Sequence, residues 1–168
     1  MTENKKTGFP PIYDKNSRVL ILGSFPSVKS REIEFYYGHK QNRFWGMLCG
    51  YFAEKIPATV ENKKEFLLRR GIALWDMVAS CYIVGSSDNS VREAEIVSLT
   101  EIFENTKIEK ILLNGSLAYQ LFLEKYAGID IPYQKMLSTS PANPRYHKEE
   151  WWNALDSVFQ CYAQEKRR

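Results

Sequence analysis

The sequence predicts an α/β protein, a three-layer α/β/α sandwich around a parallel sheet. Short apolar runs of strand character alternate with helical patterns along the chain, as in a parallel sheet with crossover helices. The 168 residues are enough to bury one sizeable core, and they contain no internal repeat, linker or low-complexity tract. We therefore expect a single domain over residues 1–168, with its core at about 17–160 and with charged ends.

Four segments are predicted to be the strands of this sheet. They are residues 18–23, 72–75, 110–113 and 133–137. The first, RVLILG, is a continuous apolar run that ends on glycine, which is typical of a strand buried on both faces. A polar turn follows each segment, and an open α/β sheet binds its ligands at the carboxyl ends of its strands. We therefore expect a ligand site at that edge.

Helical patterns lie between these strands. They cover residues 41–52, about 60–70 and 116–126. Gly71 is expected to end the second of these helices, and Gly128 the third. Residues 90–93 (SVRE) and 98–101 (SLTE) match the capping-box pattern, which predicts two short helices in succession. A last helix has one apolar stripe, made of Trp151, Leu155, Val158, Phe159 and Tyr162.

Composition and charge exclude several classes of protein. The chain is 44% hydrophobic and 26% charged, as in a folded globular protein, and no apolar run reaches the roughly 20 residues that cross a bilayer. The first residues lack a secretory signal, so we expect a cytoplasmic protein without a membrane partner. Three dispersed cysteines and two isolated histidines disfavour an iron–sulfur cluster and a zinc site. The net charge of +3 is compatible with a nucleic-acid partner and does not establish one.

Four segments after the predicted strands carry the side chains best suited to chemistry. GSFPS (23–27) is a tight turn whose amides can face an anion or a base edge. FYYGHKQNRFW (35–45) mixes aromatic rings with Lys40 and Arg43, the combination that stacks bases and holds phosphates. Asp76 follows a strand, and STSPANPR (138–145) is a polar loop whose hydroxyls and amides suit a phosphate.

Each segment also has an ordinary structural interpretation. The turn can be only a turn, Phe44 and Trp45 can simply dock a helix, and Asp76 can be a helix cap. Other catalytic patterns are absent, including the GxSxG elbow, the Walker loop, GxGxxG and a close pair of carboxylates. The shared position of the four segments at strand ends is therefore the informative observation.

Taken together, the stretches VLILGSFPS, YYGHKQNRFW, GIALWD and STSPAN resemble the uracil-DNA glycosylase superfamily. The most similar branch is the hypoxanthine-DNA (deoxyinosine) glycosylases, followed by the mismatch-specific uracil/thymine glycosylases, which also carry an Asn-Arg-Phe-Trp element. The resemblance covers residues 17–160 in the expected order. It implies a four-stranded parallel sheet and the hydrolysis of an N-glycosidic bond, without a metal or cofactor, on a base flipped out of DNA. The implied partner is DNA that contains a deaminated base, bound by a monomer.

The resemblance also implies roles for individual residues. Phe25 stands where the superfamily usually has the Asp or Asn that positions water, and in the hypoxanthine branch an asparagine of the second stretch takes that role, here Asn42. Tyr37 or Tyr36 would stack on the base, and Asp76 would accept a hydrogen bond from N1–H of hypoxanthine. The backbone amides at Ser24 and Phe25 would donate hydrogen bonds to O6 of the base.

The remaining roles concern DNA. Ser138 replaces the histidine of the superfamily's last motif, and Ala142 lies near the position of its bulky wedge, so that Asn143 or Arg145 would fill the vacated stack. Asn114 is expected to hold a turn rather than to touch DNA. The residues expected to contact DNA are Ser27, Lys40, Arg43, Ser138, Ser140, Ala142, Asn143 and Arg145.

Three functions remain open at this point. The first is a glycosylase for hypoxanthine, or alternatively for mismatched uracil. The second is a non-catalytic reader of damaged DNA that has lost the water-positioning group, and the third is an enzyme acting on free nucleosides. Grouping of Lys40, Arg43 and Arg145 on one basic face would favour DNA over a small molecule.

Overall fold

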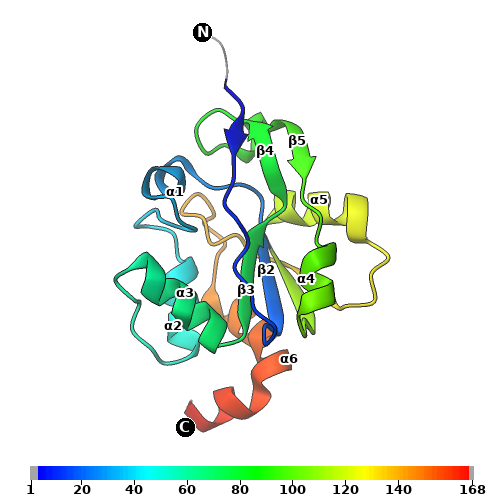
Figure 1. The fold of residues 1–168 in the computed structure, drawn as a ribbon. Coiled ribbons are helices and arrows are strands. Elements are labelled where there is room, and N and C mark those ends of the chain that lie inside the picture. Colours follow the sequence, from blue (N-terminus) through cyan, green and yellow to red (C-terminus); the bar gives the residue numbers. More distant parts are fainter. Residues whose placement is uncertain (1–3, 167–168) are drawn as a thin grey trace.

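The parallel sheet has the strand order β3-β2-β6-β7, and all its neighbouring strands are parallel (Figure 1). The structure is a computed structural model that describes residues 4–166, with side chains described as far as residue 159. The strands are β2 (Val19–Gly23), β3 (Ile72–Asp76), β6 (Lys110–Asn114) and β7 (Tyr133–Met136). All four strand predictions are confirmed to within one residue at each end.

Helices cover both faces of this sheet (Figure 1). Side chains alternate between the faces of a strand, so Val19 and Ile21 of β2 join one buried cluster and Leu20 and Leu22 join the other. The first cluster includes residues of α2 (Phe44–Tyr51), α3 (Val60–Arg69) and α6 (Lys148–Lys166). The second includes residues of α4 (Thr100–Asn105) and α5 (Ser116–Tyr126). The predicted three-layer α/β/α architecture is thereby confirmed.

A second, antiparallel sheet was not predicted. It has the order β1-β4-β5, with β1 (Lys6–Thr7), β4 (Val78–Tyr82) and β5 (Arg92–Ile96). The helix predicted from the capping box at 90–93 is therefore wrong. The Ser90 hydroxyl instead donates to the carbonyls of Val84 and Ser87, within the loop before β5, and the residues that follow it pair with β4.

The second capping box gave a helix in the right place with the wrong cap. Helix α4 begins at Thr100, and no side chain caps it at Leu99, while the Ser98 hydroxyl donates to the Thr100 hydroxyl. Sequence reasoning also missed α1 (Val28–Ile33), which the Ser27 hydroxyl caps by accepting from the N–H of Ser30.

The remaining helix boundaries differ little from the predictions. Helix α2 begins at Phe44 rather than at residue 41, and α3 ends before Gly71, whose φ of +72° suits a helix-ending glycine. Trp151 and Leu155 of α6 are buried as predicted, and non-helical backbone angles at Phe159 mark a kink. The predicted contribution of the Tyr162 side chain lies outside the described residues, as do parts of both charged ends.

The carboxyl ends of the parallel strands meet at one edge of the sheet. Gly23, the last residue of β2, pairs with Asp76, the last residue of β3. On the other side of β2, Leu22 pairs with Leu113, which places Asn114 level with Gly23, at the same edge of the sheet. Three side-chain positions from distant parts of the sequence are thereby brought together. In the part of the chain described here, no helix is both long and apolar enough to cross a membrane.

Candidate active site

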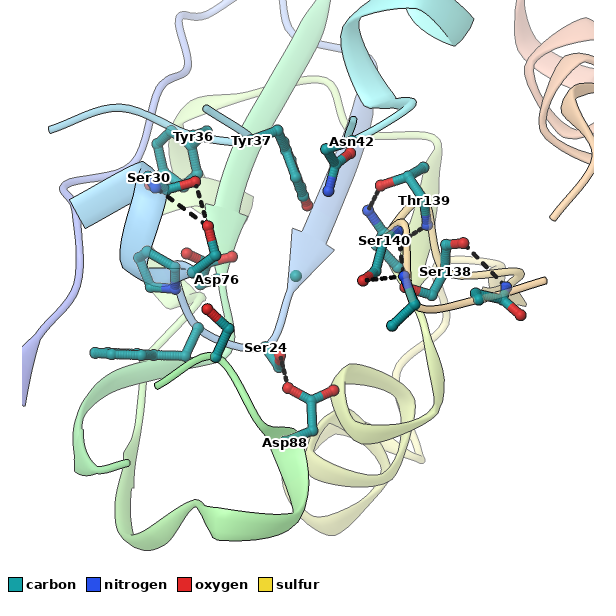
Figure 2. A pocket seen from close by; sticks show the side chains of 18 of the residues that line it. Ser24, Ser30, Tyr36, Tyr37, Asn42, Asp76, Asp88, Ser138, Thr139 and Ser140 are labelled. Atoms are coloured by element: carbon teal, nitrogen blue, oxygen red, sulfur yellow. Dashed lines mark hydrogen bonds between the residues drawn. The ribbon is translucent and has the colours of Figure 1, made fainter. Parts of the chain in front are cut away.

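A pocket of about 460 Å³ opens at this edge of the sheet (Figure 2). In Figure 2, Asp76, Tyr37 and Asn42 lie across from the loop that carries Ser138 and Ser140. Eleven of the side chains predicted as site residues line the pocket. They are Ser24, Phe25, Ser27, Tyr36, Tyr37, Asn42, Asp76, Ser138, Ser140, Ala142 and Asn143. The strand-end argument thus located the pocket correctly, although lining a pocket does not by itself give a residue its role.

Three predicted DNA contacts lie elsewhere. Lys40, Arg43 and Arg145 are not among the residues that line the pocket. Lys40 and Arg145 are exposed to solvent. The predicted phosphate contacts of these residues therefore stay predictions about the surface around the pocket.

The wall of the pocket at the end of β2 requires a glycine. A Cβ atom at Gly23 would lie 2.4 Å from Oδ1 of Asp76 and 2.9 Å from the hydroxyl of Tyr37. Both distances are shorter than non-bonded atoms tolerate, so a side chain here would displace the carboxyl group or the phenol. Gly23 therefore allows Asp76 and Tyr37 to approach the backbone at the same point.

Asp76 is a buried carboxyl group without a cationic partner among the described residues. Its side chain belongs to a residue only 5% exposed, and its Oδ2 atom has no hydrogen-bond partner. Burial, with a smaller contribution from the charge of Asp88, raises the pKa of Asp76 to about 7. Buried polar atoms are nearly always hydrogen-bonded in folded proteins, so an unpartnered carboxyl oxygen in a pocket wall is available to a ligand.

Tyr37 contributes a second unpartnered polar atom. Its backbone has the unusual φ of +53°, and its ring stacks on Phe44 with centroids 4.1 Å apart. Its hydroxyl has no hydrogen-bond partner in the described part of the chain. Burial and the nearby Asp76 carboxylate raise the pKa of the Tyr37 phenol, so the hydroxyl remains protonated. It is therefore a potential hydrogen-bond donor beside Asp76.

Tyr36 has a different environment from Tyr37, although both line the pocket. Tyr36 is only 3% exposed, and its ring packs edge-on against Phe9 and Phe35 in the core. Its hydroxyl donates to the carbonyl of Pro10 at 2.7 Å. Of the two tyrosines predicted as the stacking residue, Tyr36 is therefore committed to the core.

Asn42 both faces the pocket and supports the start of α2. It lines the pocket, and its Oδ1 atom accepts a hydrogen bond of 2.9 Å from the N–H of Phe44, the first residue of α2. This bond satisfies one of the free amide groups at the start of the helix. A carbonyl oxygen has two lone pairs, so Oδ1 can accept a second hydrogen bond from the pocket side.

Arg43 holds the loop that forms the opposite wall. Its guanidinium donates to the carbonyls of Thr139, Ser140 and Asn143, and it lies over the ring of Tyr146 with its Cζ 4.3 Å from the centroid. The loop is also tied to itself, since Nδ2 of Asn143 donates to the carbonyl of Ser138. The structure thus gives Arg43 a role in fixing the loop, which sequence reasoning did not foresee.

Sequence reasoning missed two further parts of the pocket wall. Asn114 was expected to hold the turn after its strand, but its side chain instead ties the end of β6 to the loop at Thr139, donating to the Thr139 hydroxyl and accepting from the Thr139 N–H, both at 3.0 Å. Asn114 and Thr139 also line the pocket. The second part is the loop between β4 and β5, which contributes Ser86, Ser87 and Asp88. The only sequence signal there was a capping box, which pointed to a helix instead.

A metal site is not formed by the described residues, since they contain no group of three His, Cys, Asp or Glu side chains suited to hold an ion. The arrangement instead offers a recess with amide, hydroxyl and carboxyl groups on its walls. Such a recess suits a flat polar ring whose edge carries both donors and acceptors.

Known proteins resemble this chain over most of its length. A family profile, the Uracil DNA glycosylase superfamily, matches residues 10–156. Two curated relatives named hypoxanthine DNA glycosylase are 34% identical over 147 residues (Methanosarcina barkeri) and 33% identical over 156 residues (Methanosarcina acetivorans). These matches cover 84% and 89% of this chain, and 90% and 97% of the relatives.

A solved structure gives the same result. The solution NMR structure of a proposed uracil DNA glycosylase from Methanosarcina acetivorans matches with a TM-score of 0.80 and 30% sequence identity. The match covers 95% of this chain and 99% of that one. Family profile, relatives and fold agree with the strand-end pocket described above, and the chain therefore belongs to the uracil DNA glycosylase superfamily.

Proposed function

We propose that this protein is a DNA glycosylase that removes hypoxanthine from DNA by hydrolysing its N-glycosidic bond. Family membership and the names of the two curated relatives support this reaction and this base. The observation that carries the proposal is the buried Asp76 carboxyl group, whose Oδ2 atom is unpartnered in a pocket that Asn42 also lines. A base edge and a water molecule each have a candidate partner there.

Asn42 is proposed to orient the attacking water. Excision leaves positive charge on the sugar and negative charge on the departing base, so the site gains most from groups that act as this charge develops. The Oδ1 atom of Asn42 is held in place by the N–H of Phe44 and keeps a lone pair for a water proton. An amide oxygen is a weak base, so it would orient the water rather than deprotonate it.

Asp76 is proposed to recognise the base. Hypoxanthine presents a donor at N1–H beside its O6 acceptor, whereas adenine has an acceptor at N1. The unpartnered Oδ2 atom of ionised Asp76 would accept a hydrogen bond from N1–H, and the backbone amides at Ser24 and Phe25 would donate hydrogen bonds to O6. Tyr37 is preferred to Tyr36 for stacking, because Tyr36 is enclosed by core residues.

The polar loop around Ser138 and Ser140 is proposed to grip the DNA backbone, together with Ser27 and the exposed Lys40. Ala142 is too small to fill the gap that a flipped nucleotide leaves in the stack. Asn143 is tied to the carbonyl of Ser138, which favours the exposed Arg145 as the filling side chain. Arg43 would act on DNA indirectly, by fixing the loop.

A panel of labelled oligonucleotides tests the function. Strands containing hypoxanthine, uracil or xanthine would be incubated with the protein and then assayed for alkali-labile sites. We expect strand breaks at hypoxanthine, and we expect EDTA to have no effect because the described residues offer no metal site. Activity on uracil alone would favour the mismatch-specific alternative, binding without turnover would favour a reader of damaged DNA, and loss of activity in EDTA that zinc restores would refute the metal-free mechanism.

Replacing Arg145 by alanine should flatten the salt dependence of DNA binding. Each phosphate contact contributes about 0.9 to the slope of log affinity against log salt on duplex DNA, so Arg145→Ala should lower that slope by about 0.9. The measurement is a binding titration at several salt concentrations. Lys107→Ala is the matched control, because Lys107 is exposed and precedes β6 at the opposite edge of the sheet. An unchanged slope in Arg145→Ala would remove this residue from the interface.

A further inference from the structure

The described residues that line the pocket include two carboxylates, Asp76 and Asp88, and no lysine, arginine or histidine. This composition is unusual for a protein that handles a polyanion. Asp76 is nine-tenths buried with an unpartnered Oδ2 atom, and Asp88 lies at the exposed rim. Figure 2 shows both side chains, together with the Ser24 hydroxyl that donates to Asp88.

Asp88 is fixed at the rim by hydrogen bonds between its loop and the segment after β2. The Ser24 hydroxyl donates to Oδ1 of Asp88 at 3.2 Å, and the N–H of Val28 donates to the Ser86 hydroxyl at 2.9 Å. Arg31 donates to the carbonyl of Gly85 at 2.7 Å. The Ser24 hydroxyl therefore binds the carboxylate at the rim of the pocket, and the other two bonds hold its loop there.

Two arginines close to the loops of the pocket bind backbone carbonyls rather than its carboxylates. Arg31 donates to the carbonyls of Ser27 and Gly85, and the Arg43 guanidinium donates to carbonyls of the opposite loop. None of the ion pairs found in the described part of the chain includes Asp76 or Asp88. No basic side chain is among the causes of the raised pKa values of Asp76 and Asp88, so among the described residues no nearby cation offsets their negative charge.

We propose that Asp76 and Asp88 make this pocket a charge filter, which accepts the neutral base hypoxanthine and rejects the anionic base xanthine. This inference rests on the proposed function. Hypoxanthine, from adenine, is neutral at neutral pH, whereas xanthine, from guanine, loses a ring proton below neutral pH in its deoxynucleoside. Both bases present N1–H beside O6, so the hydrogen bond to Asp76 cannot separate them. Charge can distinguish the two bases, because like charges held close together in a pocket repel strongly.

The filter should relax in acid. Burial and the nearby Asp88 raise the pKa of Asp76 to about 7, and the other titratable side chains that face it, Tyr36 and Tyr37, remain neutral phenols. Lowering the pH below neutrality therefore protonates both Asp76 and xanthine, and the repulsion between them disappears. Exclusion of xanthine by its shape would show no such dependence on pH.

The test compares single-turnover excision of hypoxanthine and of xanthine from otherwise identical oligonucleotides, corrected for base loss without protein. The wild type should excise hypoxanthine about 100-fold faster than xanthine at about pH 8. This preference should be smaller by a factor of about 10 or more at about pH 5.5. Asp88→Asn keeps an acceptor for the Ser24 hydroxyl and removes the charge, so it should lower the preference at about pH 8 by about 10-fold. Asp130→Asn removes an exposed charge outside the pocket and should leave the preference unchanged.

The outcomes separate this inference from the proposed function. Excision of both bases at similar rates at about pH 8 would overturn the filter and leave the glycosylase intact. A strong preference that Asp88→Asn leaves unchanged would also overturn it. Such a preference would indicate exclusion by shape if it is also independent of pH, and the poorer leaving ability of the xanthine anion if it falls in acid. Failure to excise hypoxanthine at any pH would instead overturn the proposed function, and the filter with it.

Discussion

Replacing Asn42 by alanine should lower single-turnover excision of hypoxanthine by about 100-fold or more, the usual loss for a positioned polar group in catalysis. Phe25 offers no polar side chain at the position that normally orients water, and Asn42 lines the same pocket. DNA affinity should change little, because the amide acts mainly as charge develops on the sugar. The measurements are a single-turnover time course and a binding titration with the same oligonucleotide.

A matched variant is needed because Asn42 also supports α2. Loss of the bond from the N–H of Phe44 to Oδ1 of Asn42 should cost about 1 kcal/mol of folding free energy. Serine is a good acceptor at helix starts and too short to reproduce the amide, so Asn42→Ser should recover most of that stability without recovering excision. If a folded Asn42→Ala protein excises at the wild-type rate, Asn42 has no part in the mechanism and Asp76 becomes the leading candidate.

Asp76→Asn should stabilise the protein at alkaline pH, by up to about 4 kcal/mol. Burial raises the pKa of Asp76 from 3.8 to about 7, so the folded state disfavours the ionised form. The cost is absent below about pH 4, grows as the pH rises, and is complete above about pH 7. Wild-type stability should therefore fall over this window relative to the variant, which carries no charge at this position.

Denaturant unfolding of both proteins between about pH 4 and pH 8 measures this difference. The two curves should meet at the acid end and separate towards neutrality, with the variant more stable. Curves that remain parallel over the window would show that Asp76 titrates normally.

The sheet could be predicted from the sequence because each strand carries its own signal. A run such as VLILG is apolar on both faces, and only a strand covered by helices on both sides buries it completely. Polar residues directly after such runs then fall at one edge of the sheet whatever the details of packing. This is why Asp76 and the turn after Gly23 were correctly assigned to a common pocket.

Local patterns failed where pairing between distant segments decided the outcome. SVRE at 90–93 fits a capping box, yet the residues that follow pair with β4, and Ser90 binds carbonyls of its own loop. Arg43 looked like a phosphate ligand beside aromatic residues, and its carbonyl partners are about one hundred positions away in sequence. A pattern of a few residues carries no information about such partners.

The sequence by itself determined the four strands of the parallel sheet and most of its covering helices, the edge of the sheet that carries the site, and most of the side chains that reach it. Only the tertiary structure decided which tyrosine is enclosed by the core, that Asn42 both supports α2 and faces the pocket, and that Asp88 joins Asp76 in an uncompensated negative pocket. The physical reason is that periodicity and strand-end placement are local properties of the chain. Burial, hydrogen-bond partners and pKa shifts depend instead on groups that folding brings together from distant positions.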